Sequence, residues 1–494
     1  GVGDAFADFL LGQTSAASIT TFQVSELEDR YIGAFVEDVW RLTPKLTVNA
    51  GVRYEIQTPP VDVNDAMANF DNDRSSPTYG TLVTATGGGY ESRSFMKVDM
   101  NNISPRLGAA YSLDEQTVIR SSYGVFYGGL GYLGNNQTGS ANPPFFVSAA
   151  INSASTAAAS GVLLSTGFPS TILDPARVTN PGVVSLPEDS PLSRTQQWNL
   201  TVERELPWKS AVSVSYIGSR GSDIRAQNDI NQPVPGAGAQ NPRRPFPTFG
   251  AINEFASWGE SRYDALQLKI ERRYANGFSF LTSYTFGKSM NNSSDGEDTT
   301  GTLTPQDPNN PDAEWALSGA DVRHRFVTSF IYDLPFGHFG PAAARAILGG
   351  WQLGGVFTAQ GGVPMSPTVA PSPANTTGTI RPNVVGDWAL SGDERTMDRW
   401  YNVAAFAAPA AFTYGNAGRN IIIAPGLVNL DLLVSRTVKL TGKYRLDIRG
   451  EFYNVANAVH LGRPELNILS PNAGKITTTQ RPPRQVQLGA RLSF

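Results

Sequence analysis

Cysteine is absent from this sequence, and histidine occurs only three times in its 494 residues. Without cysteine, the chain can have no disulfide framework, thiolate metal site or cysteine nucleophile. His324, His338 and His460 belong to no HExxH or similar pattern of metal ligands. The sequence therefore predicts no enzyme and no bound cofactor.

Long hydrophobic runs are missing as well. Hydrophobic residues make up 40% of the chain and aromatic residues 10%, yet no apolar stretch approaches the roughly 20 residues that a membrane-spanning helix requires. This excludes a helical membrane protein. It does not exclude a membrane β-barrel, because only alternate residues of a barrel strand face lipid.

Positive charge is not in excess either. The chain has 39 Lys and Arg against 43 Asp and Glu, which gives a formal net charge of −4. No basic run stands out in the sequence, whereas a protein that binds nucleic acid usually shows a basic face. We therefore expect no nucleic-acid partner.

What the sequence does contain is a series of strand pairs. The two strands of most pairs are joined by a very short turn, and long polar loops separate one pair from the next. This asymmetry is typical of outer-membrane barrels, whose short turns lie in the periplasm and whose long loops lie outside. We count about thirteen to fourteen antiparallel strands, at 31–40, 46–56, 103–113, 117–128, 193–206, 211–224, 261–274, 278–291, 322–334, 351–362, 427–439, 443–455 and 484–494.

The terminal strand alternates most clearly between apolar and polar residues. Its apolar positions share one face because the side-chain period of a strand is two, and they end on an aromatic residue that resembles the assembly signal of outer-membrane proteins. If this strand ends in the periplasm, every short turn lies there too. The predicted signal consists of Val486, Leu488, Ala490, Leu492 and Phe494.

Charged residues occupy one face of several other strands. An arginine placed against lipid at the bilayer midplane would cost about 2–4 kcal/mol, so we expect this face to line the barrel lumen. The charges could form cross-strand ion pairs, contact a plug or guide a ligand. The candidates are Arg53, Glu55, Lys269, Glu271, Arg323, Arg325, Arg445, Asp447, Arg449 and Glu451. The strand at 31–40 shows no clear face.

Two soluble architectures also contain repeated hairpins. A β-propeller would repeat every roughly 40–50 residues with blade motifs, which the sequence lacks. A β-sandwich would alternate in the same way, but it explains neither the loop asymmetry nor the charged inner face. The fold we predict is therefore all-β, a transmembrane antiparallel β-barrel in the bacterial outer membrane.

Nearly the whole chain resembles the C-terminal barrel of TonB-dependent outer-membrane receptors, in particular the Oar-like group that carries a carboxypeptidase-regulatory-like domain. Single motifs are weak, but their order is specific. They are FADFLLGQ (6–13), YIGAFVEDVWRLTPKLTVNAGVRYE (31–55), NISPRLGAAYSL (102–113), WNLTVERELP (198–207), SYIGSRG (215–221), YDALQLKIERRYANGFSFLTSYTFGKS (263–289), DVRHRFVTSFIYDLPFG (321–337), VNLDLLVSRTVKL (428–440), LDIRGEFYNVANAVHLGRP (446–464) and the closing LSF.

The resemblance implies a plug-bearing barrel of about 22 strands that imports a ligand with energy delivered through TonB. On this reading, residues 1–30 are an incoming segment of the barrel and residues 31–494 are its C-terminal part, while the plug, TonB box and N-terminal domain belong to a longer exported precursor. The expected partners are outer-membrane lipid, the barrel-assembly machinery, the plug and TonB. The ligand stays open, and a passive porin or an adhesion scaffold is the alternative function.

Overall fold

The structure is a computed structural model of the chain. It describes residues 24–86, 90–128, 139–152, 178–293, 305–338, 347–440 and 442–494, together with positions 6, 10, 12, 16–21, 165, 167–168, 172–174 and 341. Most of the motif at 6–13 and nearly half of the segment at 1–30 lie outside the described residues. Of the described helices, none is long and apolar enough to cross a membrane.

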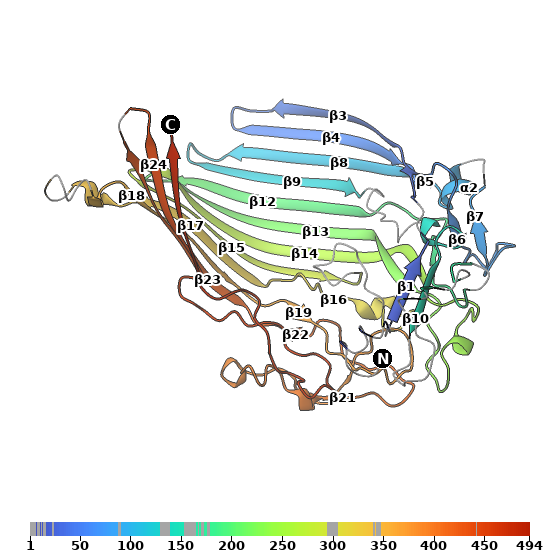
Figure 1. The fold of residues 1–494 in the computed structure, drawn as a ribbon. Coiled ribbons are helices and arrows are strands. Elements are labelled where there is room, and N and C mark those ends of the chain that lie inside the picture. The colour runs from blue at the N-terminus through green and yellow to red at the C-terminus, as the bar shows by residue number, and fades with distance from the viewer. Residues whose placement is uncertain are drawn as a thin grey trace.

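One large sheet dominates the fold (Figure 1). Thirteen of its fifteen strands follow one another as antiparallel neighbours, and each corresponds to a strand predicted from the sequence. They are β3 (Tyr31–Arg41), β4 (Leu46–Gln57), β8 (Asp99–Ser112), β9 (Thr117–Tyr127), β12 (Arg194–Leu206), β13 (Ser210–Asp229), β14 (Ile252–Ala275), β15 (Phe278–Asn291), β17 (His324–Asp333), β18 (Trp351–Gln360), β23 (Leu427–Lys439), β24 (Arg445–Tyr453) and β25 (Gln485–Ser493).

The longest hairpin extends further than its sequence suggests. The strands predicted at 211–224 and 261–274 leave a loop over 225–260, but β13 continues to Asp229 and β14 already begins at Ile252. Two register shifts, between Gly221 and Ala226, interrupt the ladder without ending it. Such irregularities bend a strand pair and increase its twist. The loop between the two strands is therefore shorter than predicted and covers residues 230–251.

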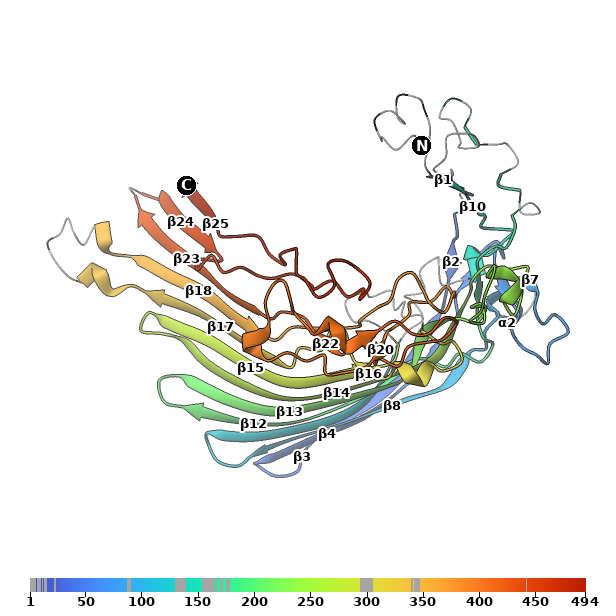
Figure 2. The same ribbon diagram turned by 90° about the horizontal axis from the view of Figure 1, so that it is seen from below.

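The sheet curves into an open trough (Figure 2). Its short turns and the C-terminus lie at one end, and the long loops lie at the other (Figure 1). Among the described residues, the edge strands β3 and β25 each pair on one side only. The described strands therefore form part of a barrel wall and do not close into a cylinder.

The long loops fold into a layer of their own, which we call the loop layer. It contains the strand pairs β6 (Ala68–Phe70)/β7 (Leu82–Thr84), β19 (Pro364–Met365)/β22 (Ile422–Ile423) and β20 (Asn383–Val384)/β21 (Phe406–Ala407). Its other short elements are β5 (Val61–Asp62), α2 (Tyr90–Ser94), β11 (Val183–Ser185), β16 (Ala316–Leu317) and the 3₁₀ helices η3 (Gly139–Ala141), η5 (Asn241–Arg243), η6 (Pro311–Glu314), η8 (Gly392–Glu394) and η9 (Val403–Ala405). The 3₁₀ helix η7 (Pro335–His338) lies instead at the end with the short turns.

The buried apolar core lies in this loop layer. One cluster gathers Phe70, Val183 and Ile252, and another gathers Tyr401, Phe406 and their neighbours. The strands cannot supply a comparable core, because a barrel wall turns one face to lipid and the other to its lumen.

The N-terminal segment does not join the large sheet at its described positions. Strand β1 (Ala16–Thr20) pairs with β10 (Ser148–Asn152), and β2 (Leu27–Glu28) pairs with β5. Both partners belong to the connections between the long strands. The large sheet begins at β3, which is where the sequence predicts its first strand.

Candidate functional site

The strand register shows which side chains share a face of the sheet. Residues directly opposite each other in a pair point to the same side, and Ile448 lies opposite Ala490 while Asp447 lies opposite Arg491. The apolar and polar faces therefore continue from strand to strand. Followed across the sheet, the register places on one polar face Arg53, Glu55, Lys269, Glu271, Arg325, Arg445, Asp447, Arg449 and Glu451.

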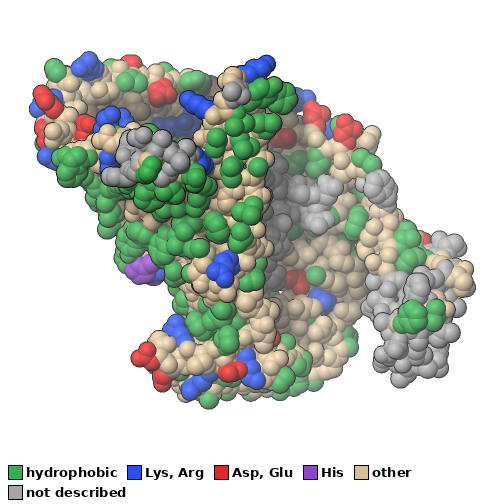
Figure 3. Space-filling model, turned by 60° about the vertical axis from the view of Figure 1, so that its left-hand side comes forward, with side chains coloured by type: hydrophobic (Ala, Val, Ile, Leu, Met, Phe, Trp, Pro, Cys, Tyr) green, Lys and Arg blue, Asp and Glu red, His purple; other side chains and the backbone are tan. Residues whose placement is uncertain are grey.

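The same register resolves the strand that the sequence left without a face. Phe35 and Glu37 of β3 lie opposite Arg53 and Gly51, on the polar side, whereas Val36 lies opposite Val52 on the apolar side. The apolar face is largely uncovered, and Figure 3 shows hydrophobic side chains gathered beside a shaded hollow. We therefore take the polar face as the inner side of the trough.

Four pairs of the predicted lumen charges form along a strand rather than across strands, whereas Arg120 of β9 and Glu203 of β12 pair across strands at 3.2 Å. Lys269 Nζ lies 2.6 Å from Glu271 Oε2, and Arg445 Nε lies 3.4 Å from Asp447 Oδ2. Arg53 pairs in the same way with Glu55, and Arg449 with Glu451. Cross-strand pairing was therefore the wrong expectation for these residues. For Arg449 the physical reason is that Gly489 and Ser435 lie opposite it, so no acidic residue faces it across the sheet.

Arg323 is an exception to the predicted lumen set. It precedes β17, so the alternation of side chains along that strand does not determine which way the Arg323 side chain points. Its guanidinium carbon lies 5.8 Å from the centre of the Phe286 ring. Phe286 lies opposite Leu266 on the outward apolar face. Arg323 therefore lies against the outer surface, whereas Arg325, opposite Thr285 and Gln360, remains inside.

The predicted assembly signal lies on the outward face of the edge strand. Leu488 is 80% exposed and Phe494 is 83% exposed, and the Phe494 ring lies 6.5 Å from that of Tyr444. Val486, Ala490 and Leu492 are exposed on the same side. The geometry leaves the whole motif accessible, while its role in assembly stays a prediction.

An apolar hollow lies on the inner face toward the end with the short turns. It has a volume of 590 Å³, and Leu281, Ile331, Val356 and Leu433 contribute to its wall. Glu271, Asp431 and Glu451 also line it. Apolar side chains on an otherwise hydrophilic lumen wall favour a covering partner, because contact with water is unfavourable for them.

A second hollow, of 680 Å³, is polar and lies over β4, β8, β9, β12 and β13. Asn199 Nδ2 donates to Ser122 Oγ at 2.6 Å, and Thr201 shares a hydrogen bond of 2.8 Å with Ser215. The Arg106 guanidinium lies 4.9 Å from the centre of the Phe126 ring. This wall offers amide, hydroxyl and guanidinium groups that could bind a polar ligand or a polar protein surface.

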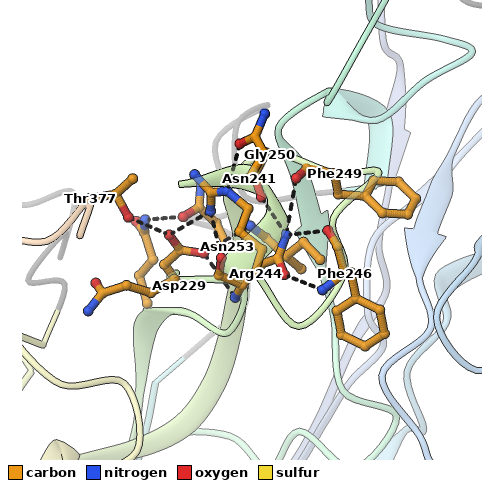
Figure 4. A network of polar contacts seen from close by, with 12 residues as sticks. Asp229, Asn241, Arg244, Phe246, Phe249, Gly250, Asn253 and Thr377 are labelled. Atoms are coloured by element: carbon orange, nitrogen blue, oxygen red, sulfur yellow. Dashed lines mark hydrogen bonds and ion pairs between the residues drawn. The ribbon is translucent and has the colours of Figure 1, made fainter. Parts of the chain in front are cut away.

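Buried polar contacts hold the loop layer together (Figure 4). The Asp229 carboxylate accepts hydrogen bonds from the backbone N–H groups of Asn231 and Ile252, both at 3.0 Å, and from Thr377 Oγ1 at 3.2 Å. Arg244 Nη1 donates to the Asn231 carbonyl at 2.6 Å. The β13–β14 connection is thus tied to the β18–β23 connection through the Thr377 hydroxyl and the buried Asp229 carboxylate.

A second buried network extends this tie to the β15–β17 connection. Glu314 Oε2 lies 2.7 Å from Arg381 Nη1, with side chains 1% and 8% exposed. Glu314 Oε1 accepts from the Gln306 N–H at 3.1 Å, and Gln232 Nε2 donates to the Gln306 carbonyl at 2.9 Å. In the same layer, burial raises the pKa of Tyr401 to about 12.

Sequence reasoning missed these loop networks. Glu314 and Arg381 lie 67 positions apart, in stretches that read only as polar loops. No short-range spacing of residues in the sequence identifies Glu314 and Arg381 as partners. The part of the chain that the structure describes also contains no group of three or more His, Asp or Glu side chains arranged to hold a metal ion.

We compared the chain with solved structures, with curated protein sequences and with models of protein families. Several solved structures of outer-membrane proteins are similar at low identity. The ferripyoverdine receptor of Pseudomonas aeruginosa is 10% identical, with a TM-score of 0.46, and the match covers 95% of this chain and 39% of that one. The siderophore receptor PiuA of Acinetobacter baumannii is 11% identical, with a TM-score of 0.45, and the match covers 94% and 43%.

The FrpB iron transporter of Neisseria meningitidis is 12% identical, with a TM-score of 0.42 and coverage of 94% and 46%. The chain thus spans less than half the length of these three proteins. Comparison with curated protein sequences gave no match. A family model described as "Outer membrane beta barrel domain" matches residues 1–487, so the chain belongs to this family of outer-membrane β-barrel proteins.

Proposed function

We propose that this chain is the C-terminal part of the barrel of a TonB-dependent receptor that takes up a ligand across the outer membrane. The observation that carries the proposal is a hydrophilic inner face with two hollows below an ordered loop layer. A polar inner wall with hollows suits a barrel through which a ligand passes along a gated path. An adhesion scaffold would use only its loops and would not need such a wall. The ordered motif resemblance, including that to the Oar-like group, supports the same reading.

The apolar hollow is the place where a plug would contact this part of the wall. Leu281, Ile331, Val356 and Leu433 leave an apolar surface facing the lumen, and a folded plug segment of the same precursor would remove it from water. Glu271, Asp431 and Glu451 offer that segment carboxylates for ion pairs. The ligand class stays open among siderophores, oligosaccharides, peptides and cobalamins.

Cysteine labelling of the full-length precursor tests the plug, because the chain has no cysteine of its own. A membrane-impermeant maleimide should react slowly with Leu281→Cys if a plug covers the hollow. Trp208→Cys is the matched control, since Trp208 lies in the β12–β13 turn and is 81% exposed. If both cysteines react at the same rate in the full-length protein, the hollow is open and the plugged-receptor proposal fails.

Bilayer conductance separates the receptor from a passive porin. A barrel with a resident plug should be nearly silent, whereas a porin should conduct steadily without any ligand. Steady conductance by the full-length protein would therefore replace the receptor by a porin. The two measurements are independent, because one reports cover over a single side chain and the other reports an open path.

A further inference from the structure

Four basic side chains lie on the outward, lipid-facing surface near the loop end of neighbouring strands. Arg194 of β12, Arg220 of β13, Arg262 of β14 and Lys288 of β15 are all exposed. We call these four residues the basic rim. They are well separated in the sequence, and only the sheet brings them together.

The register places the basic rim within a compact area. Arg220 lies directly opposite Arg262, and Lys288 lies opposite Asp264. Arg194 lies opposite Ser222, two positions along β13 from Arg220, and its Nε donates to Ser222 Oγ at 3.3 Å. At about 4.8 Å per strand and about 3.3 Å per residue, the group covers roughly 14 Å across three strand spacings by roughly 13 Å along four residue positions.

The basic rim carries a surplus of positive charge. Asp264 lies inside it, 2.6 Å from Arg262 Nε, and Asp223 Oδ2 accepts a hydrogen bond of 2.9 Å from the Ser222 hydroxyl that Arg194 also contacts. With Glu260, the next acidic residue along the same face of β14, four cations meet three carboxylates. Arg194, Arg220 and Lys288 form no ion pair with the described residues, and like charges directly opposite each other, as in Arg220 and Arg262, destabilise a sheet.

Outward cations at the opposite end of the strands are partnered differently. Arg204 Nη1 lies 3.7 Å from Asp114 Oδ2, and Arg436 Nη1 donates to the Ile347 carbonyl at 2.7 Å. Each of these two cations thus has a contact with an oxygen of another segment of the protein. The basic rim therefore differs from a row of cations that only marks the edge of the membrane.

Aromatic and apolar residues continue from the basic rim toward the turns. Trp198 lies across Gly218, where an added Cβ would come within 2.3 Å of the indole, and the Tyr216 hydroxyl donates to Asp264 Oδ1 at 2.7 Å. Aromatic girdles mark the membrane interface of a barrel. Beyond them Leu200 and Leu266, each 50% exposed, continue the apolar surface.

We infer that the basic rim binds the phosphate-bearing headgroup of a lipid in the outer leaflet, with the acyl chains lying along the apolar surface below. Guanidinium groups bind phosphate oxygens through paired hydrogen bonds. An anion at this position would also relieve the repulsion between Arg220 and Arg262. The location follows from the loop end of the sheet, which faces the exterior in outer-membrane barrels.

Native mass spectrometry of the full-length protein in detergent tests this site. The probes are bis-phosphorylated lipid A and the same lipid after enzymatic removal of its phosphates. Wild-type protein should retain the phosphorylated lipid, and the variant Arg194→Gln/Arg220→Gln should retain it about tenfold less, which corresponds to roughly 1.4 kcal/mol. The inner-face variant Lys269→Gln/Arg325→Gln removes the same charge and should behave like wild type.

Three results would overturn the inference. The first is equal retention of both lipids by the wild-type protein, a comparison that needs no variant and so holds even if a variant fails to fold. The second is an equal loss in the rim and inner-face variants. The third is a dimer that forms through this face and persists without lipid, because a second copy of the chain would then be the occupant.

Discussion

The buried ion pair between Glu314 and Arg381 should stabilise the loop layer far more than the sheet. Their side chains are 1% and 8% exposed and their charged atoms are 2.7 Å apart. Removing one partner of such a pair leaves an uncompensated buried charge, at a cost of about 3–5 kcal/mol. Because Arg381 Nε also donates to the Ala417 carbonyl at 2.9 Å, we expect Glu314→Gln to lie near the lower end of that range.

Native-state hydrogen exchange is the suitable assay, because the loop layer can open while the membrane strands stay folded. The Arg381 amide donates to Gln306 Oε1 at 2.8 Å and the Ala417 amide donates to the Pro382 carbonyl at 2.9 Å. A loss of about 3 kcal/mol corresponds to exchange at least about a hundredfold faster at these two amides. Amides of the membrane strands should exchange as in wild type.

The control breaks an ion pair at the surface. Glu188→Gln removes one of the two acidic partners of Lys97, whose charged nitrogen lies 3.1 Å from Glu188 Oε1 and 3.3 Å from Asp189 Oδ1, and it should cost less than about 1 kcal/mol. The double variant Glu314→Leu/Arg381→Met should recover much of the loss, since an apolar pair of similar volume often replaces a buried ion pair without penalty. Unchanged exchange in Glu314→Gln, or strictly additive losses in the double variant, would refute the reasoning.

Three further predictions concern the faces, the C-terminus and the loop layer. Leu268→Arg, on the outward face, should lower stability in bilayers by about 2–4 kcal/mol more than Gln267→Arg on the inner face; equal losses in urea unfolding would contradict the assignment of faces. Phe494→Ala should reduce the folded, heat-modifiable fraction in cells while leaving unfolding of the purified protein unchanged, because Phe494 is 83% exposed. Tyr401 has its pKa raised from 10.0 to about 12 by burial, so the unfolded loop layer loses this proton first and stability should fall between pH 10 and 12. Tyr401→Phe should flatten that part of a near-ultraviolet circular dichroism titration.

Most of the sheet could be predicted from the sequence because strand alternation is local. The period of two in Val486, Leu488 and Leu492 identifies both the strand and its outward face, and the register of β24 and β25 agrees with it. The same argument failed at Arg323. Arg323 precedes its strand, so strand alternation does not determine the direction of its side chain. Its contact with the Phe286 ring does.

The strand register also decided how the inner charges pair. Arg449 was expected to find a partner across the sheet, but Ser435 and Gly489 lie opposite it, and Glu451 on its own strand is the acid within reach. A partner on a neighbouring strand depends on the alignment of two segments that are distant in the sequence. A single residue of slip would change every such pair.

By itself, the sequence determined the strands, their apolar and polar faces and the barrel class, because each depends on residues within a few positions of one another. Only the tertiary structure decided that β13 and β14 extend into the predicted loop from both sides, that Glu314 meets Arg381, and that four cations from four strands form the basic rim. The sequence has no basic run, since those cations come together only when neighbouring strands align. Contacts between residues far apart in the sequence depend on loop closure and on the register of neighbouring strands. A local pattern of residues predicts neither.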